Sequence, residues 1–244
     1  MSLGHPIDSD RHAVPGGPRA AGAAAIAEGA LRDAGTAGHP VLRNTYRLLS
    51  MTLLFSAGVA VTSAALGWPH PGLWLTLGGF FGLLFLTSWL RNSVWGLAAV
   101  FALTGFMGYT LGPVLNLYLA MANGPALIAT AAGATGIAFF GLSFYARSAA
   151  APDMSRWGTF LLVGVLTALG LGIAAVVFSL SALALAVSAL VVLLMCGLIM
   201  YETQNIVRGG ETNYIMATVT LFVSVYNLFT SLLHLLGFFG GEEG

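Results

Sequence analysis

The sequence has no lysine, and charged residues of any kind make up only 7% of its 244 residues. An ordinary globular domain carries about a quarter charged residues. The absence of lysine excludes a phosphate-binding loop in which a lysine follows the glycines. Nine arginines balance nine acidic residues. The arginines leave no basic patch once each is assigned its place in the predicted topology of the chain. A nucleic-acid partner is therefore not expected.

Cysteine and catalytic motifs are equally scarce. Cys196 is the single cysteine, so no intramolecular disulfide can form. There is no HExxH sequence and no cluster of histidine and cysteine with metal-ligand spacing. Ser143 in "FGLSFY", with His234 in another apolar segment, resembles an intramembrane serine protease pair, but the serine lacks the glycine that follows it in that motif. We therefore expect no enzymatic activity, no cofactor and no metal.

The chain is instead rich in apolar sequence, with 57% hydrophobic residues and a mean hydropathy of +0.87. Runs of roughly 18 or more apolar residues, enough to cross a bilayer, recur along it. Short connectors make neighbouring helices antiparallel. The pattern predicts an all-α integral membrane protein with seven transmembrane helices, near residues 48–66, 72–90, 93–118, 126–146, 157–178, 181–203 and 214–238.

Residues 1–42 differ from the rest, being rich in Gly, Ala and Pro and free of aromatic residues. They have too few large apolar side chains for a core, so we expect a disordered tail. The apolar stretch "AGAAAIA" is too short for a signal peptide. Residues 43–240 then form one transmembrane domain.

Arginine placement predicts the orientation. With seven spans, all nine arginines fall on one side of the membrane: Arg11, Arg19, Arg32, Arg43, Arg47, Arg91, Arg147, Arg156 and Arg208. The opposite connectors have none. The positive-inside rule makes the arginine side the cytoplasm. We therefore expect a cytoplasmic N-terminus and an external C-terminus.

The last span has a polar stripe at steps of four and three residues, which places it on one helix face: Thr220, Ser224, Asn227, Ser231 and His234. Polar groups are costly against lipid, so this face is expected to meet other helices or water. It serves either for hydrogen bonding between helices or as the lining of a central polar pathway. Both interpretations make this helix central.

Small residues are frequent in the third and fourth spans, in "LTGFMGYTLGP" and "AAGATGIAFFG". Ala129, Ala132 and Gly136 have a spacing that permits close helix contact. Pro113 in the third span removes a backbone hydrogen bond and predicts a packing kink.

Glu202 is the acidic residue whose place in the sequence raises a question, because it ends the sixth span. It is either a solvated interfacial residue, paired with Arg208, or a buried titrating group that pairs with an arginine from another helix. Arg91 is eligible because topology puts it at the same depth. Periodicity does not decide between these alternatives.

Several ordered motifs resemble the Bax inhibitor-1 family, and within it the bacterial YccA-like branch. They are "GFMGYTLGPVLNLYL", "GIAFFGLSFYA", "GLIMYETQNIV", "GGETNYIMATVTLFVSVYNLF" and "LLHLLGFFG". The resemblance covers residues 43–240. It implies a fold in which six helices surround the seventh.

In calcium-leak members of this family, an arginine and two acidic residues form a pH-sensitive latch. The resemblance places Arg91 in the arginine position and Glu202 in the first acidic position, whereas Ser224 occupies the second. When two carboxylates lie close together, their pKa values move apart and one of them rises. A lone Glu202 facing Arg91 would instead be held ionised. A single glutamate with a serine also offers fewer charged oxygen ligands for Ca²⁺, which prefers six to eight oxygens.

The YccA-like branch implies an inner-membrane protein that is a substrate and modulator of the membrane-anchored AAA protease FtsH. The segment 1–42 suits such a protease, which needs an unstructured end to begin from. We therefore expect a partner of FtsH in the bilayer. The alternative is a pH-sensitive calcium leak channel gated by the Arg91–Glu202 latch.

Overall fold

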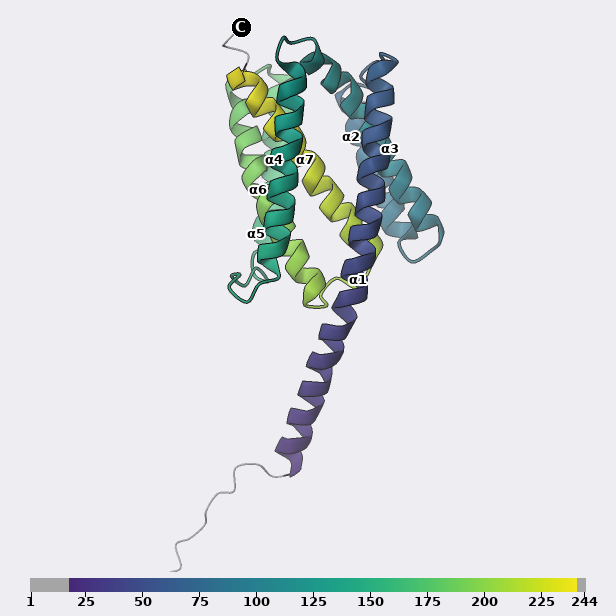
Figure 1. Cartoon of the computed structure of the whole chain (residues 1–244), viewed down its shortest axis with the longest axis vertical. Helices are drawn as coiled ribbons and strands as arrows, with labels where there is room; N and C mark the ends of the chain where they lie inside the picture. The colour runs from purple at the N-terminus through teal and green to yellow at the C-terminus, as the bar shows by residue number, and fades with distance from the viewer. Residues whose placement is uncertain (1–17, 241–244) are drawn as a thin grey trace, which may run out of the picture.

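The computed structural model describes residues 18–240, and for residues 18–39 it describes the backbone alone. Seven helices make up this part of the chain (Figure 1): α1 (Pro18–Ala65), α2 (Leu73–Leu90), α3 (Trp95–Leu119), α4 (Gly124–Ala146), α5 (Gly158–Val177), α6 (Ser181–Val207) and α7 (Tyr214–Gly240). Each contains a stretch long and apolar enough to cross a membrane. The predicted all-α class with seven membrane-spanning helices is confirmed.

α1 begins earlier than the sequence predicts. Its membrane-spanning part is Pro40–Ala65, whereas the expected span began near residue 48. The helical backbone continues back to Pro18, where the sequence predicted an unstructured tail; residues 1–17 lie outside the described part. Alanine has the highest helix propensity, and it dominates residues 20–27. This part of α1 projects beyond the other helices (Figure 1).

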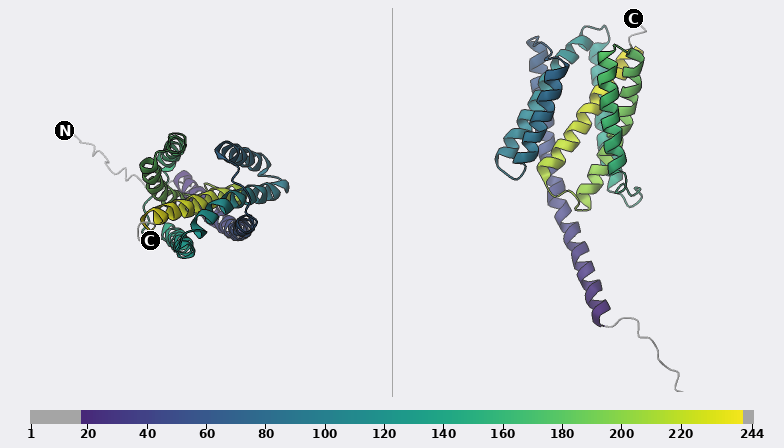
Figure 2. Two further views of the ribbon diagram at one scale, coloured as in Figure 1. Left: turned by 90° about the horizontal axis from the view of Figure 1, so that it is seen from above. Right: turned by 180° about the vertical axis from the view of Figure 1, so that it is seen from behind.

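α7 lies in the middle of the bundle. It packs against α6, α4, α1 and α3, while α2 packs against α3 and α5 against α6. Seen from above, α7 crosses between these groups (Figure 2). Its Leu221, Phe222, Leu228 and Leu233 are at most 1% exposed. Four helices thus pack closely on α7, where the family resemblance implied six, and α2 and α5 form the outer flanks.

The connectors after α2, α4 and α6 lie at one end of the bundle, the end from which α1 projects (Figure 1). Arg91, Arg147 and Arg208 directly follow these three helices. Arg43 lies near the start of the spanning part of α1. Because successive helices run in opposite directions, these arginines lie at the same end of the bundle, which we call the arginine end. That this end faces the cytoplasm stays a prediction.

α3 approaches α1 closely through glycine. A Cβ atom at Gly108 would collide with the carbonyl oxygen of Ser56, and one at Gly112 would collide with the Ser63 side chain. The close approach also brings side chains within reach of the neighbouring backbone. The Ser63 hydroxyl donates to the Tyr109 carbonyl at 3.0 Å, and the Asn116 amide donates to the Ala64 carbonyl at 2.9 Å. Pro113 lies inside α3.

Candidate functional site at the arginine end

Glu202 lies in the last turns of α6 and is only 5% exposed. Its neighbours Thr203 and Gln204 are also buried. The sequence left open whether Glu202 is solvated or buried, and the structure fits only the buried alternative. A buried carboxylate is costly unless it is paired or neutralised, so the surroundings of Glu202 decide what it can do.

Glu202 has no cationic partner among the residues whose side chains are described. In that part of the chain, the one ion pair joins Arg208 to Asp153. Arg91 is exposed and forms no ion pair there with Glu202. A second carboxylate, Glu211, lies in the connector that follows α6. The latch between Arg91 and Glu202 therefore stays a prediction.

Arg91 is nevertheless held beside α7 through its backbone. The side-chain amide of Asn213 donates to the Arg91 carbonyl at 3.1 Å and to Oδ1 of Asn92 at 2.9 Å. Oδ1 of the same asparagine accepts the N–H groups of Ile215 and Met216, at 3.0 and 3.2 Å. Asn213 thus caps the first turn of α7 and ties it to the end of α2.

The connector that carries Asn213 is itself ordered by hydrogen bonds. Oε1 of Glu211 accepts the N–H of Asn213 at 2.7 Å, and the carbonyl of Asn205 accepts the N–H of Gly210 at 2.9 Å. Gly209 adopts a φ of 76°, which favours glycine. Asn213 was not identified from the sequence, although an asparagine just before a predicted helix is a recognised capping signal.

A second joint connects α6 to the connector between α4 and α5. Gln204 is 4% exposed. Its Oε1 accepts the N–H of Met154 at 3.0 Å, and its Nε2 donates to the Pro152 carbonyl at 2.9 Å. Arg208 pairs with Asp153 at the exposed edge of this joint. Sequence reasoning missed Gln204, because periodicity does not show what a side chain reaches on another segment.

Asp153 has a strongly lowered pKa. The backbone N–H of Ser155 donates to the Asp153 carboxylate, and Arg208 pairs with it; together they lower its pKa from 3.8 to about 2. Hydrogen bonds and opposite charge both favour the ionised form. Asp153 is therefore ionised at neutral pH, and its partner Arg208 is half exposed.

The polar stripe of α7 is largely satisfied within its own helix. Ser224 is 1% exposed and donates to the Thr220 carbonyl at 2.8 Å. Thr220 donates to Met216, and Asn227 donates to Val223. Ser231 is 9% exposed. Ser224 and Ser231 of the stripe are buried, and Thr220, Asn227 and His234 are partly buried. The bonds within the helix favour a packing role over a water-lined pathway.

Among the described residues, His234 makes the one hydrogen bond of this stripe to another helix. Its Nδ1 lies 2.7 Å from the Ser188 hydroxyl of α6. Ser143, the other residue weighed as a protease pair, is 1% exposed, and its hydroxyl has no hydrogen-bond partner among the described residues. The described part of the chain holds no group of three or more His, Cys, Asp or Glu residues that could bind a metal.

Comparison with known proteins gives concordant matches. The family described as inhibitor of apoptosis-promoting Bax1 matches residues 38–241. The chain is 50% identical over 200 residues to "Modulator of FtsH protease YccA" of Escherichia coli K12, covering 82% of this chain and 90% of that protein. The same identity and coverage hold for "Inner membrane protein YccA" of Escherichia coli O6:H1. An uncharacterized protein of Pseudomonas aeruginosa is 50% identical over 203 residues, with 83% and 91% coverage.

Proposed function

The chain belongs to the family of inhibitors of apoptosis-promoting Bax1, and from that premise we propose a modulator of an FtsH-type membrane protease. It is a multi-pass protein of the bacterial inner membrane that binds the protease complex and has no enzymatic activity of its own. The observation that carries this proposal is the 50% identity to the Escherichia coli protein named as a modulator of FtsH. The family match, over residues 38–241, includes all seven membrane-spanning segments.

The geometry of α1 supports a role for the N-terminal segment. The spanning part of α1 begins at Pro40, yet the helical backbone starts at Pro18 and projects from the arginine end (Figure 1). The proposed orientation places this projection in the cytoplasm. A cytoplasmic AAA protease would meet the N-terminal segment before it meets the bundle. The segment is therefore the proposed point of engagement, and the helices contact the complex within the membrane.

Deletion of residues 2–40 tests this assignment. In cells that contain FtsH, the deleted protein is expected to live longer than the full chain in a pulse-chase measurement. In cells that lack FtsH the two lifetimes are expected to be equal. A matched control removes residues 241–244 from the other terminus and is expected to leave the lifetime unchanged. An unchanged lifetime for the 2–40 deletion would refute the role of the segment.

Co-purification tests the partner independently. The full chain in mild detergent is expected to retain FtsH, and so is the 2–40 deletion, at least in part, through its membrane helices. If the full chain does not retain FtsH under conditions that preserve the protease complex, the proposed partner is wrong. If the full chain retains FtsH and the 2–40 deletion does not, all of the binding is made by the N-terminal segment.

A calcium leak is the second candidate, and the burial of Glu202 favours it. Glu202 is a buried carboxylate near the end of α6, and Glu211 follows in the next connector, although Ser224 replaces the second acid of the calcium-leak pattern. Purified protein in liposomes is expected to pass Ca²⁺ if this function holds, and Glu202→Gln is expected to change the flux. Arg91→Gln tests the latch in the same assay. Liposomes without flux would exclude this function.

A further inference from the structure

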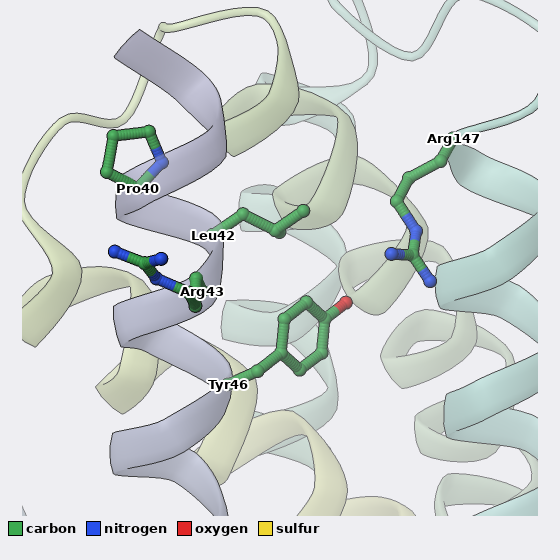
Figure 3. A pocket seen from close by; sticks show the side chains of 5 residues that line it. All are labelled: Pro40, Leu42, Arg43, Tyr46 and Arg147. Carbon is green, nitrogen blue, oxygen red and sulfur yellow. The ribbon is translucent and has the colours of Figure 1, made fainter. Parts of the chain in front are cut away.

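A cleft of about 510 Å³ opens at the arginine end between α1 and α4 (Figure 3). Its lining residues are Pro40, Leu42, Arg43, Tyr46 and Arg147. They include two arginines and no acidic residue. α1 packs against α3, α7 and α6, so the cleft separates it from α4 and is bridged only by side chains.

Arg147 is fixed at one wall of this cleft. It follows the last turn of α4, and its Nε donates to the Ser143 carbonyl at 3.0 Å. The guanidinium carbon lies 6.0 Å from the centre of the Tyr46 ring, within cation–π range. The hydrogen bond leaves both terminal amino groups without a partner among the described residues. These amino groups are held ready for an anion, since a guanidinium binds phosphate through two parallel hydrogen bonds.

The hydroxyl of Tyr46 faces Arg147 across the cleft (Figure 3). Its oxygen is buried and has no hydrogen-bond partner among the described residues. The ring is held by an edge contact with Phe139 of α4, with centroids 5.8 Å apart. A buried hydroxyl without a partner destabilises the folded chain. A ligand oxygen in the cleft would satisfy it, and the same oxygen could also accept from Arg147.

The surface beside the cleft is strongly apolar. Phe140, Phe144 and Arg147 follow one another at steps of four and three along α4, so they share one helix face. The two phenylalanines are 70% and 75% exposed. In a membrane this face meets the acyl chains, with Arg147 above it at the level of the headgroups. A ligand that suits the whole face is anionic at one end and apolar along the other.

We propose that the cleft between α1 and α4 binds the phosphate headgroup of an anionic phospholipid. Arg147 and the Tyr46 hydroxyl hold the phosphate, and an acyl chain lies along Phe140 and Phe144. Basic pockets between transmembrane helices bind anionic headgroups on the cytoplasmic side of other membrane proteins. This site is separate from Glu202 and does not depend on the protease function.

Lipid binding by the full chain in detergent tests the site. Native mass spectrometry and thermal stability are measured with phosphatidylglycerol, with phosphatidylcholine of the same acyl chains, and with inorganic phosphate. Both lipids carry the phosphate, but the quaternary ammonium of phosphatidylcholine would lie near the Arg147 guanidinium and be repelled by it. The wild-type chain is therefore expected to prefer phosphatidylglycerol about tenfold. Arg147→Gln and Tyr46→Phe are each expected to lower that affinity roughly fivefold to tenfold.

Arg156→Gln is the matched control. Arg156 lies at the same end of the bundle, in the connector after α4, but outside the cleft. The control is expected to change the affinity by less than about twofold. If it weakens binding as much as Arg147→Gln does, the lipid is held by general surface charge and the proposal is wrong.

Two further outcomes would overturn the assignment. Inorganic phosphate that stabilises the chain as much as phosphatidylglycerol would make the ligand a soluble anion. An unchanged affinity in Tyr46→Phe would remove the hydroxyl from the site, and this variant decides the matter if Arg147→Gln does not fold. The Tyr46→Phe change removes a single oxygen that bonds to nothing in the described protein, so it leaves the bundle intact.

Discussion

α3 carries Gly105, Gly108 and Gly112, and α4 carries Gly133, Gly136 and Gly141, so the two helices look alike in sequence. These glycines differ in how closely another helix approaches them. Those of α3 face α1 so closely that each lacks room for a Cβ atom, whereas a Cβ atom at any of the three in α4 would have nothing within 4 Å. A pattern of small residues permits close contact between helices, but it does not require that contact to form.

α4 is attached to the bundle by other means. It packs on α7 and α6, its Phe139 meets Tyr46 of α1, and the connector that follows it is held by Gln204. The close contact predicted at Ala129, Ala132 and Gly136 is not made within this chain: the two alanines are exposed, and Gly136 has open space beside it. The α1–α3 contact depends on close approach of the two helices at Gly108 and Gly112, joined by side-chain hydrogen bonds. The contact of α4 with α1 is made by side chains.

The largest loss of stability is expected from Gly108→Ala, because this substitution disrupts the close contact between α3 and the backbone of α1. The new methyl group would meet the Ser56 carbonyl, which cannot rotate away as a side chain can. Forced overpacking of this kind costs about 3 kcal/mol. The measurement is the free energy of unfolding in a denaturing-detergent titration. A loss below about 1 kcal/mol would show that α1 and α3 shift apart easily.

Gln204→Ala is expected to have the next largest effect, because it releases the connector after α4. It leaves the Met154 N–H and the Pro152 carbonyl without their partner, at a cost of about 2 kcal/mol. Limited proteolysis of the connector is expected to become faster. Thr159→Ala, at an exposed position near the start of α5, serves as the control and is expected to change neither measurement.

Gly133→Ala is expected to range from no effect to a gain of about 1 kcal/mol in unfolding free energy, because alanine favours helix and nothing obstructs its methyl group. The same titration measures it. This variant is the direct counterpart of Gly108→Ala. A clear loss of stability in the membrane would break the comparison and show that a second protein packs against this face of α4.

Asp153→Asn is expected to have the smallest effect, confined to acid pH. The pKa of Asp153 is lowered from 3.8 to about 2 in the folded chain. Its ionised form therefore contributes stability above about pH 4, and that contribution is lost as the pH falls toward 2. The substitution is expected to remove this part of the acid sensitivity of connector proteolysis. High salt should weaken the same effect in the wild type, because the Arg208–Asp153 pair is exposed.

At the candidate site, the sequence placed Arg91 and Glu202 at one end of the bundle, which the structure bears out as a matter of position. It did not show which groups touch. Glu202 is buried and has no cationic partner among the described side chains, while the Arg91 carbonyl bonds to Asn213. Connector lengths and the placement of charged residues determine the side of the membrane on which a residue lies. They carry no information on how helices rotate or which side chains meet across them.

The sequence by itself determined the membrane class, the seven spans and the family, because each depends on composition, run length or local motifs. The polar stripe led to the prediction that the last span is central, and in the structure four helices pack on α7. Three features were decided only by the tertiary structure. Gly108 and Gly112 of α3, rather than the glycines in the middle of α4, lie in close contact with α1. Gln204 and Asn213 connect separate segments at the arginine end, and Tyr46 and Arg147 face each other across a cleft. These features depend on which helix faces lie together, and that choice is made by the packing of the whole bundle.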